Sequence, residues 1–263
     1  MTICIAAVCT HNDKELFVIA TDHMINVNIG QFEHDIKKHK IIHDNNIAML
    51  AGNALIFNEL IANIEKCAFT EIKKKIFENF VKLRKDYINK QLLSKFGLNE
   101  SDITQIVRGT IQNPFTGKLL DSIAKFDFKT SILLVGYENG AAQIAEIREH
   151  GFADFSDIHF HAIGSGQIQA ANTLLFQKQS KSDSLKTAIY NVYKSKRNAE
   201  VSSGVGKETD IMVLTENGCF YLRQDDLKTL SGIYEEELQL GKNSGELNKL
   251  GILNNEKFIT SKK

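Results

Sequence analysis

The most constraining feature of this sequence is a pair of short apolar runs at its start. Residues 3–9 (ICIAAVC) and 15–21 (ELFVIAT) are rich in Ala, Val and Ile, and the polar segment THNDK joins them. Two runs of this kind around a short polar link predict a β-hairpin. A strand covered on one face alternates apolar and polar residues, whereas these runs are apolar at nearly every position. We therefore expect a sheet that is covered on both faces.

Further strands and helices follow in an irregular order. The segment KKHKIIHDNNIAMLAG predicts two short strands around a turn at Asp44–Asn46, and apolar residues at helical spacing over 57–64 predict a helix after Gly52. Near the end of the chain, Asn217-Gly218 between two strands predicts a type I′ turn. The remaining strands are expected at 131–147 and 159–166, and the helices that follow them at 167–177 and 184–196.

These elements predict a single α+β domain spanning 1–263. They show no regular βαβ alternation, and no glycine-rich phosphate loop opens a helix. The arrangement that fits best is a four-layer αββα sandwich of two mainly antiparallel sheets, packed face to face with helices outside. A less regular helical and loop excursion at about 85–129 holds the single proline, Pro114. A C-terminal helix and then a polar tail are expected from about residue 225.

The amino-acid composition argues against nucleic-acid and membrane partners. Lys+Arg and Asp+Glu number 32 each, so no overall positive field attracts nucleic acid or a membrane surface. The apolar start is too short to span a membrane and lacks the basic segment of a signal peptide. The four cysteines lack metal-ligand spacing and are typical of buried reduced thiols. We therefore expect a soluble cytoplasmic protein without nucleic-acid or membrane partners.

Thr2 stands immediately before the first apolar run. A threonine hydroxyl is a weak nucleophile unless a base takes its proton. An N-terminal threonine carries a candidate base of its own, the α-amino group, whose reference pKa is about 7.7–8.0. Because a small second residue permits removal of the initiator methionine, we expect the mature chain to begin at Thr2. Position alone would favour a plainer interpretation, in which Thr2 begins an edge strand.

Three further residues, at fixed separations in the sequence, favour a catalytic role for Thr2. Asp22 ends the motif ATD, Lys38 follows it by 16 residues, and Gly52 ends an Ala-Gly pair 14 residues later. In these motifs the sequence resembles the proteasome β-type family of N-terminal nucleophile hydrolases, with a first hairpin longer by about four residues. Lys40 is an alternative to Lys38, since the family lysine often precedes isoleucine, but it requires gaps on both sides. Strand alternation would place both lysines on the same face.

Two later motifs extend the resemblance over most of the chain. AIGSG matches the family's Gly-Ser-Gly before a helix and identifies Ser165. EVSSG corresponds to the family's Asp-x-x-Ser-Gly and identifies Glu200 and Ser203. Glutamate in place of aspartate is a departure, because its extra methylene changes the hydrogen bonds that this loop makes near the threonine. As single residues, Ser165 and Ser203 are equally well explained as turn and cap residues.

The resemblance implies an N-terminal nucleophile hydrolase fold and a threonine peptidase mechanism. Thr2 would attack a peptide carbonyl and form an acyl ester. The Lys38 ammonium would disfavour protonation of the α-amine, and Asp22 would hold that ammonium in place. The Gly52 N–H would stabilise the oxyanion. The residues that would position the amine and a bridging water are Ser165, Glu200 and Ser203.

The resemblance also implies partners. A peptide or unfolded protein would be the substrate, the chain would assemble as a homo-oligomeric ring or a related assembly, and a regulatory ATPase would be a further partner. No metal or organic cofactor is required. His159 and His161 alternate on an expected strand, but no third ligand stands at metal spacing, so we expect structural histidines. Cys4 is a weaker candidate nucleophile than Thr2, because we expect its thiol to be buried in an apolar strand and it lacks a base of its own.

Two alternative functions remain open. One is a non-catalytic shell or interaction subunit of the same fold. Proteasome α-type subunits carry an N-terminal helical extension before the first strand, and we expect none before Ile3. The other is an amide-transfer enzyme, a ligase or amidase, that forms the same acyl ester but acts on a different acceptor or a smaller amide. No residue in the sequence separates hydrolysis from transfer.

Overall fold

We describe a computed structural model of the chain, which covers residues 2–27, 30–34, 37–43, 45–109 and 116–242. The chain divides into two compact units, Met1–Tyr221 and Leu222–Lys263. The second unit contains the expected C-terminal helix as α7 (Gln224–Lys242), whose first turn is acidic at Asp225 and Asp226. The polar tail predicted after it lies outside the described residues.

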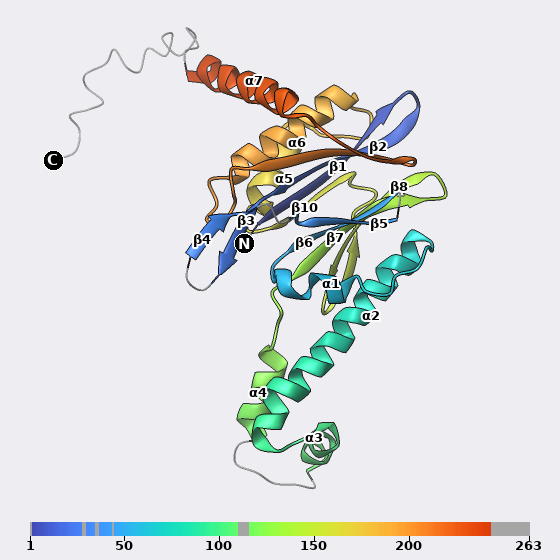
Figure 1. The fold of residues 1–263 in the computed structure, drawn as a ribbon, viewed down its shortest axis with the longest axis vertical. Coiled ribbons are helices and arrows are strands. Elements are labelled where there is room, and N and C mark those ends of the chain that lie inside the picture. Colours follow the sequence, from blue (N-terminus) through green and yellow to red (C-terminus); the bar gives the residue numbers. More distant parts are fainter. Residues whose placement is uncertain (1, 28–29, 35–36, 44, 110–115, 243–263) are drawn as a thin grey trace, which may run out of the picture. The chain divides into compact units, whose positions relative to one another are not determined.

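Two five-stranded antiparallel sheets form the centre of the first unit (Figure 1). The first sheet contains, in spatial order, β10 (Phe160–Gly164), β1 (Ile3–His11), β2 (Lys14–Asp22), β11 (Thr209–Thr215) and β12 (Gly218–Tyr221). The second contains β5 (His39–His43), β6 (Asn46–Ala51), β7 (Ser131–Glu138), β8 (Ala141–Arg148) and β9 (Gly151–Asp154). A small hairpin that the sequence did not predict follows β2 and contains β3 (Met24–Val27) and β4 (Gly30–Glu33).

The first hairpin is buried on both faces, as its apolar sequence predicts. Cys4, Ala6 and Val8 belong to the apolar core between the two sheets. Because side chains alternate along a strand, Ile3 and Ile5 point to the opposite face, and both are fully buried there. The unbroken apolar run of β1 therefore reflects a strand that has a sheet on one side and helices on the other.

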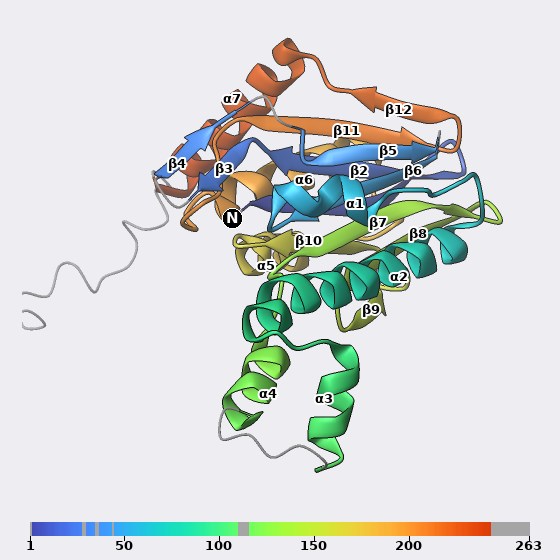
Figure 2. The same cartoon turned by 60° about the horizontal axis from the view of Figure 1, so that its bottom comes forward.

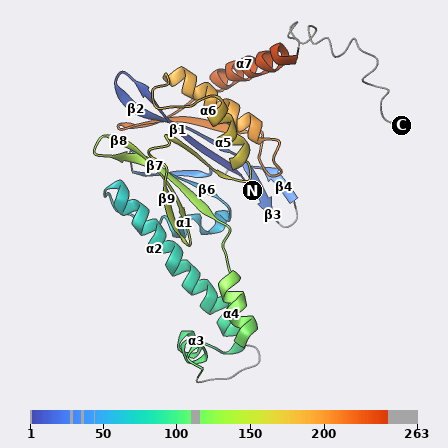
Figure 3. The ribbon, with the colours of Figure 1, turned by 180° about the vertical axis from the view of Figure 1, so that it is seen from behind.

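Helices cover the outer face of each sheet. In Figure 3, α5 (Gln167–Phe176) and α6 (Leu185–Ala199) lie over the sheet that contains β1 and β2. The second sheet is covered by α1 (Phe57–Leu60) and α2 (Phe69–Tyr87), whose apolar side chains pack on β6, β7 and β8. The four-layer αββα sandwich predicted from the sequence is thus confirmed.

Two local predictions are wrong. The helix expected over 57–64 ends at Leu60, and Asn63 adopts a left-handed conformation with φ of 57° that a helix cannot continue through. The type I′ turn expected at Asn217-Gly218 does not form, because Gly218 pairs with Thr215 as the first residue of β12. Consecutive left-handed residues, which a type I′ turn requires, occur instead at Asn12-Asp13 and Asn139-Gly140.

The segment at about 85–129 is a helical excursion, as predicted. From the end of α2 the chain continues through a π-helical turn at Ile88–Leu93 and a 3-10 turn at Ser94–Phe96. Then α3 (Glu100–Val107) and α4 (Thr116–Lys125) project beyond the end of α2, away from the sheets (Figure 2). Pro114 lies outside the described residues. The chain returns to the second sheet through 126–130, which forms one wall of the cavity described below.

Candidate active site

A hydroxyl, an ammonium and a carboxylate meet at one end of the first sheet. Thr2 precedes β1, Asp22 ends β2, and Lys38 precedes β5. The Thr2 Oγ1 donates to Asp22 Oδ1, and the Lys38 Nζ donates both to Thr2 Oγ1 and, at 2.7 Å, to Asp22 Oδ1. The structure therefore brings together three of the residues that the sequence motifs identify.

Strand pairing explains why these residues meet. Cys4 pairs with Thr21 in the antiparallel β1–β2 ladder, so the first residues of β1 lie beside the last residues of β2. The backbone of Lys38 is tied to β6 by the Leu50 N–H, which donates to the Lys38 carbonyl at 2.8 Å. The hydrophobic pattern of both hairpins thus determines where the lysine and the aspartate approach Thr2.

Lys40 is not part of this cluster. Its Nζ donates to Asn58 Oδ1 and lies 5.3 Å from the centroid of the Phe57 ring. Lys38 reaches Thr2 and Asp22, whereas Lys40 contacts Asn58 and Phe57 of α1, which covers the outer face of the second sheet. The sequence-based expectation of a shared face is therefore wrong.

The Asp22 carboxylate is fully buried and accepts five hydrogen bonds. Besides the Thr2 and Lys38 bonds, Oδ1 accepts from the Ile3 N–H at 3.0 Å. Oδ2 accepts from the Met24 N–H at 3.3 Å and from the Gly206 N–H at 2.8 Å. This set of donors offsets the desolvation of a buried charge.

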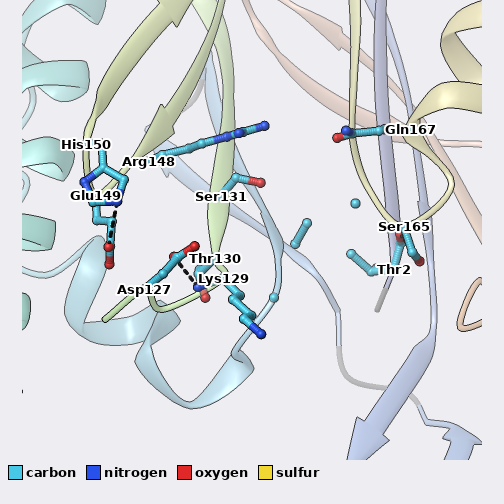
Figure 4. Close-up of a pocket in the computed structure, with 13 residues that line it drawn as sticks. Thr2, Asp127, Lys129, Thr130, Ser131, Arg148, Glu149, His150, Ser165 and Gln167 are labelled. Carbon is cyan, nitrogen blue, oxygen red and sulfur yellow. Dashed lines mark hydrogen bonds and ion pairs between the residues drawn. The ribbon is translucent and has the colours of Figure 1, made fainter. Parts of the chain in front are cut away.

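Thr2 also lines a cavity of about 450 Å³. Figure 4 shows Thr2, Ser165 and Gln167 on one wall. The opposite wall comes from 127–131 and from the end of β8 with the residues after it, and Arg148 extends from β8 between the walls. The ionisable side chains of this cavity are of both signs: Asp127, Lys129, Arg148, Glu149 and His150.

Two glycines allow close approach at this site. Gly52 follows β6 with φ of 123° and lines the same cavity as Thr2, and a Cβ there would lie 2.4 Å from the Lys129 carbonyl oxygen. Gly164 has φ of 107°, and a Cβ there would lie 2.2 Å from the carbonyl oxygen of Thr2. Ser165 donates through Oγ to the same Thr2 oxygen at 3.3 Å. Ser165 therefore contacts Thr2 through the carbonyl oxygen, and its predicted role in positioning the Thr2 amine stays a prediction.

Glu200 and Ser203 make no such contact. Because the longer glutamate side chain reaches back along α6, its Oε1 accepts from the Lys196 Nζ at 2.7 Å, and its Oε2 lies 3.5 Å from the Arg197 Nε. Ser203 is exposed, and no hydrogen bond of its hydroxyl is found within the described residues. The prediction that these two residues position the amine has no support in their placement.

Sequence reasoning missed Gly206. It lies between α6 and β11, where a Cβ would be 2.7 Å from Glu33 Oε1 and 3.0 Å from the Met24 nitrogen. Its N–H bond to Asp22 joins residues 184 positions apart. A single glycine in an irregular loop carries no local signal of such a long-range contact.

His161 has a structural partner, and Cys4 is fully buried. His161 Nε2 lies 3.0 Å from Glu146 Oε2, while His159 lies before β10 with φ of 66° rather than on the strand. Within the described ranges, no group of three His, Cys, Asp or Glu residues is placed to hold a metal ion. Burial raises the pKa of the Cys4 thiol well above its usual range, which suppresses the nucleophilic thiolate.

Comparison with models of known protein families gives no match for this chain, and no curated protein matches it. The resemblance to the proteasome β-type family therefore stays a prediction based on the motif residues. None of the helices in the described part of the chain combines the length and apolar character needed to cross a bilayer.

Proposed function

We propose that this protein is an N-terminal threonine hydrolase that cleaves peptide bonds through an acyl ester on Thr2. The observation that carries the proposal is the hydrogen-bonded cluster of Thr2 Oγ1, Lys38 Nζ and Asp22 Oδ1. A nucleophile activated by a neighbouring group, which is itself oriented by a third group, is the usual arrangement in covalent catalysis. The adjoining cavity supplies room for an extended peptide segment.

In the proposed reaction, Thr2 Oγ attacks the peptide carbonyl carbon. The α-amino group, exposed when Met1 is removed, takes the hydroxyl proton directly or through one water and passes it to the leaving amine. Lys38 stabilises the negative charge that develops on Oγ, and Asp22 balances the lysine charge. The Gly52 N–H donates to the carbonyl oxyanion. Water then hydrolyses the acyl ester and regenerates the free hydroxyl.

Intact mass spectrometry tests this proposal. The purified chain should lack Met1 and should gain one adduct with a threonine-directed electrophile such as an epoxyketone. Thr2→Ala should abolish the adduct, whereas Thr10→Ala, in which the lost hydroxyl donates to the Lys181 carbonyl, should leave it unchanged. Retained Met1 would refute the mechanism, because the amine would then be blocked.

The same experiment separates the alternatives. Removal of Met1 without an adduct or peptide cleavage, across electrophiles of different side chains, would favour a non-catalytic shell subunit. An acyl ester that is transferred to an added amine in preference to water would favour an amide-transfer enzyme. Product analysis with peptide libraries distinguishes transfer from hydrolysis.

We further propose that the chain self-associates. Ile168, Leu175 and Phe176 on α5 are 65%, 61% and 84% exposed, which is unusual for large apolar side chains and suits contact with a second copy. Light scattering at micromolar concentration tests this, and a monodisperse species of 29.5 kDa would refute it. A cytoplasmic location is also proposed, and the four free cysteines support it.

A further inference from the structure

Lys196 is a fully buried lysine that the proposed reaction does not use. It lies on α6 with a relative exposure of 0%, and its Nζ donates to Glu200 Oε1 at 2.7 Å and to the Lys207 carbonyl oxygen at 2.6 Å. A lysine paired with a glutamate four residues later normally lies on a solvent-exposed helix surface, where the pair contributes little. Here the ammonium points inward, toward the loop between α6 and β11.

Burying this ammonium is costly. Burial lowers the pKa of Lys196, while the hydrogen bond and charge of Glu200 act in the opposite direction. An apolar residue of similar volume at such a position is often as stable as a buried ion pair or more stable. The stability of α6 alone therefore does not account for a lysine here, and its contacts indicate what else it does.

The contacts of Lys196 fix a peptide group next to Asp22. The carbonyl of Lys207 accepts from the Lys196 ammonium, and the N–H groups of Lys207 and Glu208 donate to Glu33 Oε1, the latter at 2.9 Å. The loop is thus held by a cation through its carbonyl oxygen and by a carboxylate through its N–H groups. The residue before Lys207 is Gly206, the backbone donor to Asp22 Oδ2.

The orientation of the Asp22 carboxylate depends on this loop, because its two oxygens accept hydrogen bonds from different parts of the chain. Oδ1 faces Thr2 and Lys38, and the shortest bond to Oδ2 comes from Gly206. A carboxylate held through both oxygens has a fixed orientation, so Oδ1 stays directed at the hydroxyl and the ammonium. The charges of Lys196 and Asp22 also attract each other directly.

We infer that Lys196 is a positioning residue for the Asp22 carboxylate, acting through the Lys207 carbonyl and the Gly206 N–H with Glu200 as its counter-charge. This gives Glu200 a role other than contact with the Thr2 amine. The inference rests on the proposed function where it concerns rate, but the placement of Asp22 can be tested without activity.

The test compares variants of the full chain by hydrogen exchange and kinetics. Lys196→Met combined with Glu200→Gln removes the buried ammonium together with its partly exposed counter-charge, so the fold is retained while the Lys207 carbonyl loses its donor. We expect exchange of the Gly206 amide to accelerate by about tenfold or more. With a peptide substrate, kcat should fall by about 10- to 100-fold, as happens when a group that orients a functional residue is lost. KM should change less than about twofold, because Lys196 does not line the substrate cavity.

The control is Ile76→Ala, which truncates a fully buried side chain on α2, over the other sheet. It should lower the melting temperature while leaving kcat and Gly206 exchange at wild-type values, when both are measured well below melting. Unchanged Gly206 exchange in the Lys196→Met/Glu200→Gln variant would overturn the inference, and so would a kcat loss matched by Ile76→Ala at equal stability. An inactive wild-type protein would refute the proposed function, while the exchange measurement would still decide the positioning of Asp22.

Discussion

Replacing Asp22 by asparagine perturbs the candidate site most directly, because it keeps the shape of the side chain and removes its charge. One of the two acceptor oxygens becomes an NH₂ group. If the amide nitrogen takes the place of Oδ2, it faces the N–H groups of Met24 and Gly206, and if it takes the place of Oδ1 it faces Thr2, Ile3 and Lys38. Either orientation leaves at least two buried donors without their acceptor.

The magnitude follows from these contacts. An unsatisfied buried donor costs about 1–3 kcal/mol, and a buried cation left without its partner costs about 3–5 kcal/mol. The Lys38 side chain is 11% exposed, so water relieves only part of this cost. We expect Asp22→Asn to lower the free energy of unfolding by about 3–5 kcal/mol. At about 2–4 °C per kcal/mol, the melting temperature should fall by about 6–20 °C.

Urea unfolding of a double-mutant cycle with Lys38→Met measures the coupling between the two charges. In the Lys38→Met background, Asp22→Asn should cost at least about 1 kcal/mol less, because no ammonium is left unbalanced. Asp121→Asn, in an exposed i,i+4 pair with Lys125, is the control and should change stability by less than about 0.5 kcal/mol. Equal costs of Asp22→Asn in both backgrounds would refute the idea that Asp22 balances the Lys38 charge.

Three further predictions follow from the geometry. Gly52→Ala should lower kcat or epoxyketone labelling by at least about tenfold, because the added Cβ displaces the proposed oxyanion donor. Gly218→Ala is the control, since it has a similar φ of 140° but open space around its Cβ, and it should change neither quantity. Equal effects of the two variants would contradict the steric argument. Burial lowers the pKa of His39 to about 4, below its unfolded value of about 6.5, so its stabilising effect is complete above pH 6.5 and is lost as the pH falls toward 4. The urea midpoint should therefore drop over this range, and His39→Gln should flatten the drop. Cys4 should react with a thiol reagent only after unfolding, which peptide mapping of the labelled protein checks, and rapid labelling of the native chain would contradict its burial.

Short-range sequence patterns were sufficient to predict the layers of the sandwich. Strands that are apolar at nearly every position, such as β1, require a covering layer on each face, and the structure provides a sheet on one side and helices on the other. The return of the chain from Lys38 to Gly52 likewise follows from the predicted hairpin between them, because antiparallel pairing brings the chain back to the same end of the sheet. These features depend on residues close together in the sequence.

Choices between neighbouring residues were decided only by the tertiary structure. Whether Lys38 or Lys40 reaches Thr2 could not be decided from the apolar pattern, because the two alternatives differ by a shift of two residues, which leaves every side chain on the same face of the strand. The ion pair of Glu200 with Lys196 depends on the inward direction of α6, since the same i,i+4 pair would be equally compatible with a solvent-exposed face.

The Gly206 N–H is the clearest example of a contact that the sequence pattern could not predict. Its hydrogen bond to Asp22 forms because α6 and β11 bring a loop back to the end of β2, and the loop itself has no periodicity from which that return could be predicted. The sequence therefore determined the strands of the two main sheets, the layers and most of the residues carrying the proposed chemistry. Only the packing of distant segments decided which backbone groups hold the Asp22 carboxylate, because such contacts depend on three-dimensional closure and not on local side-chain pattern.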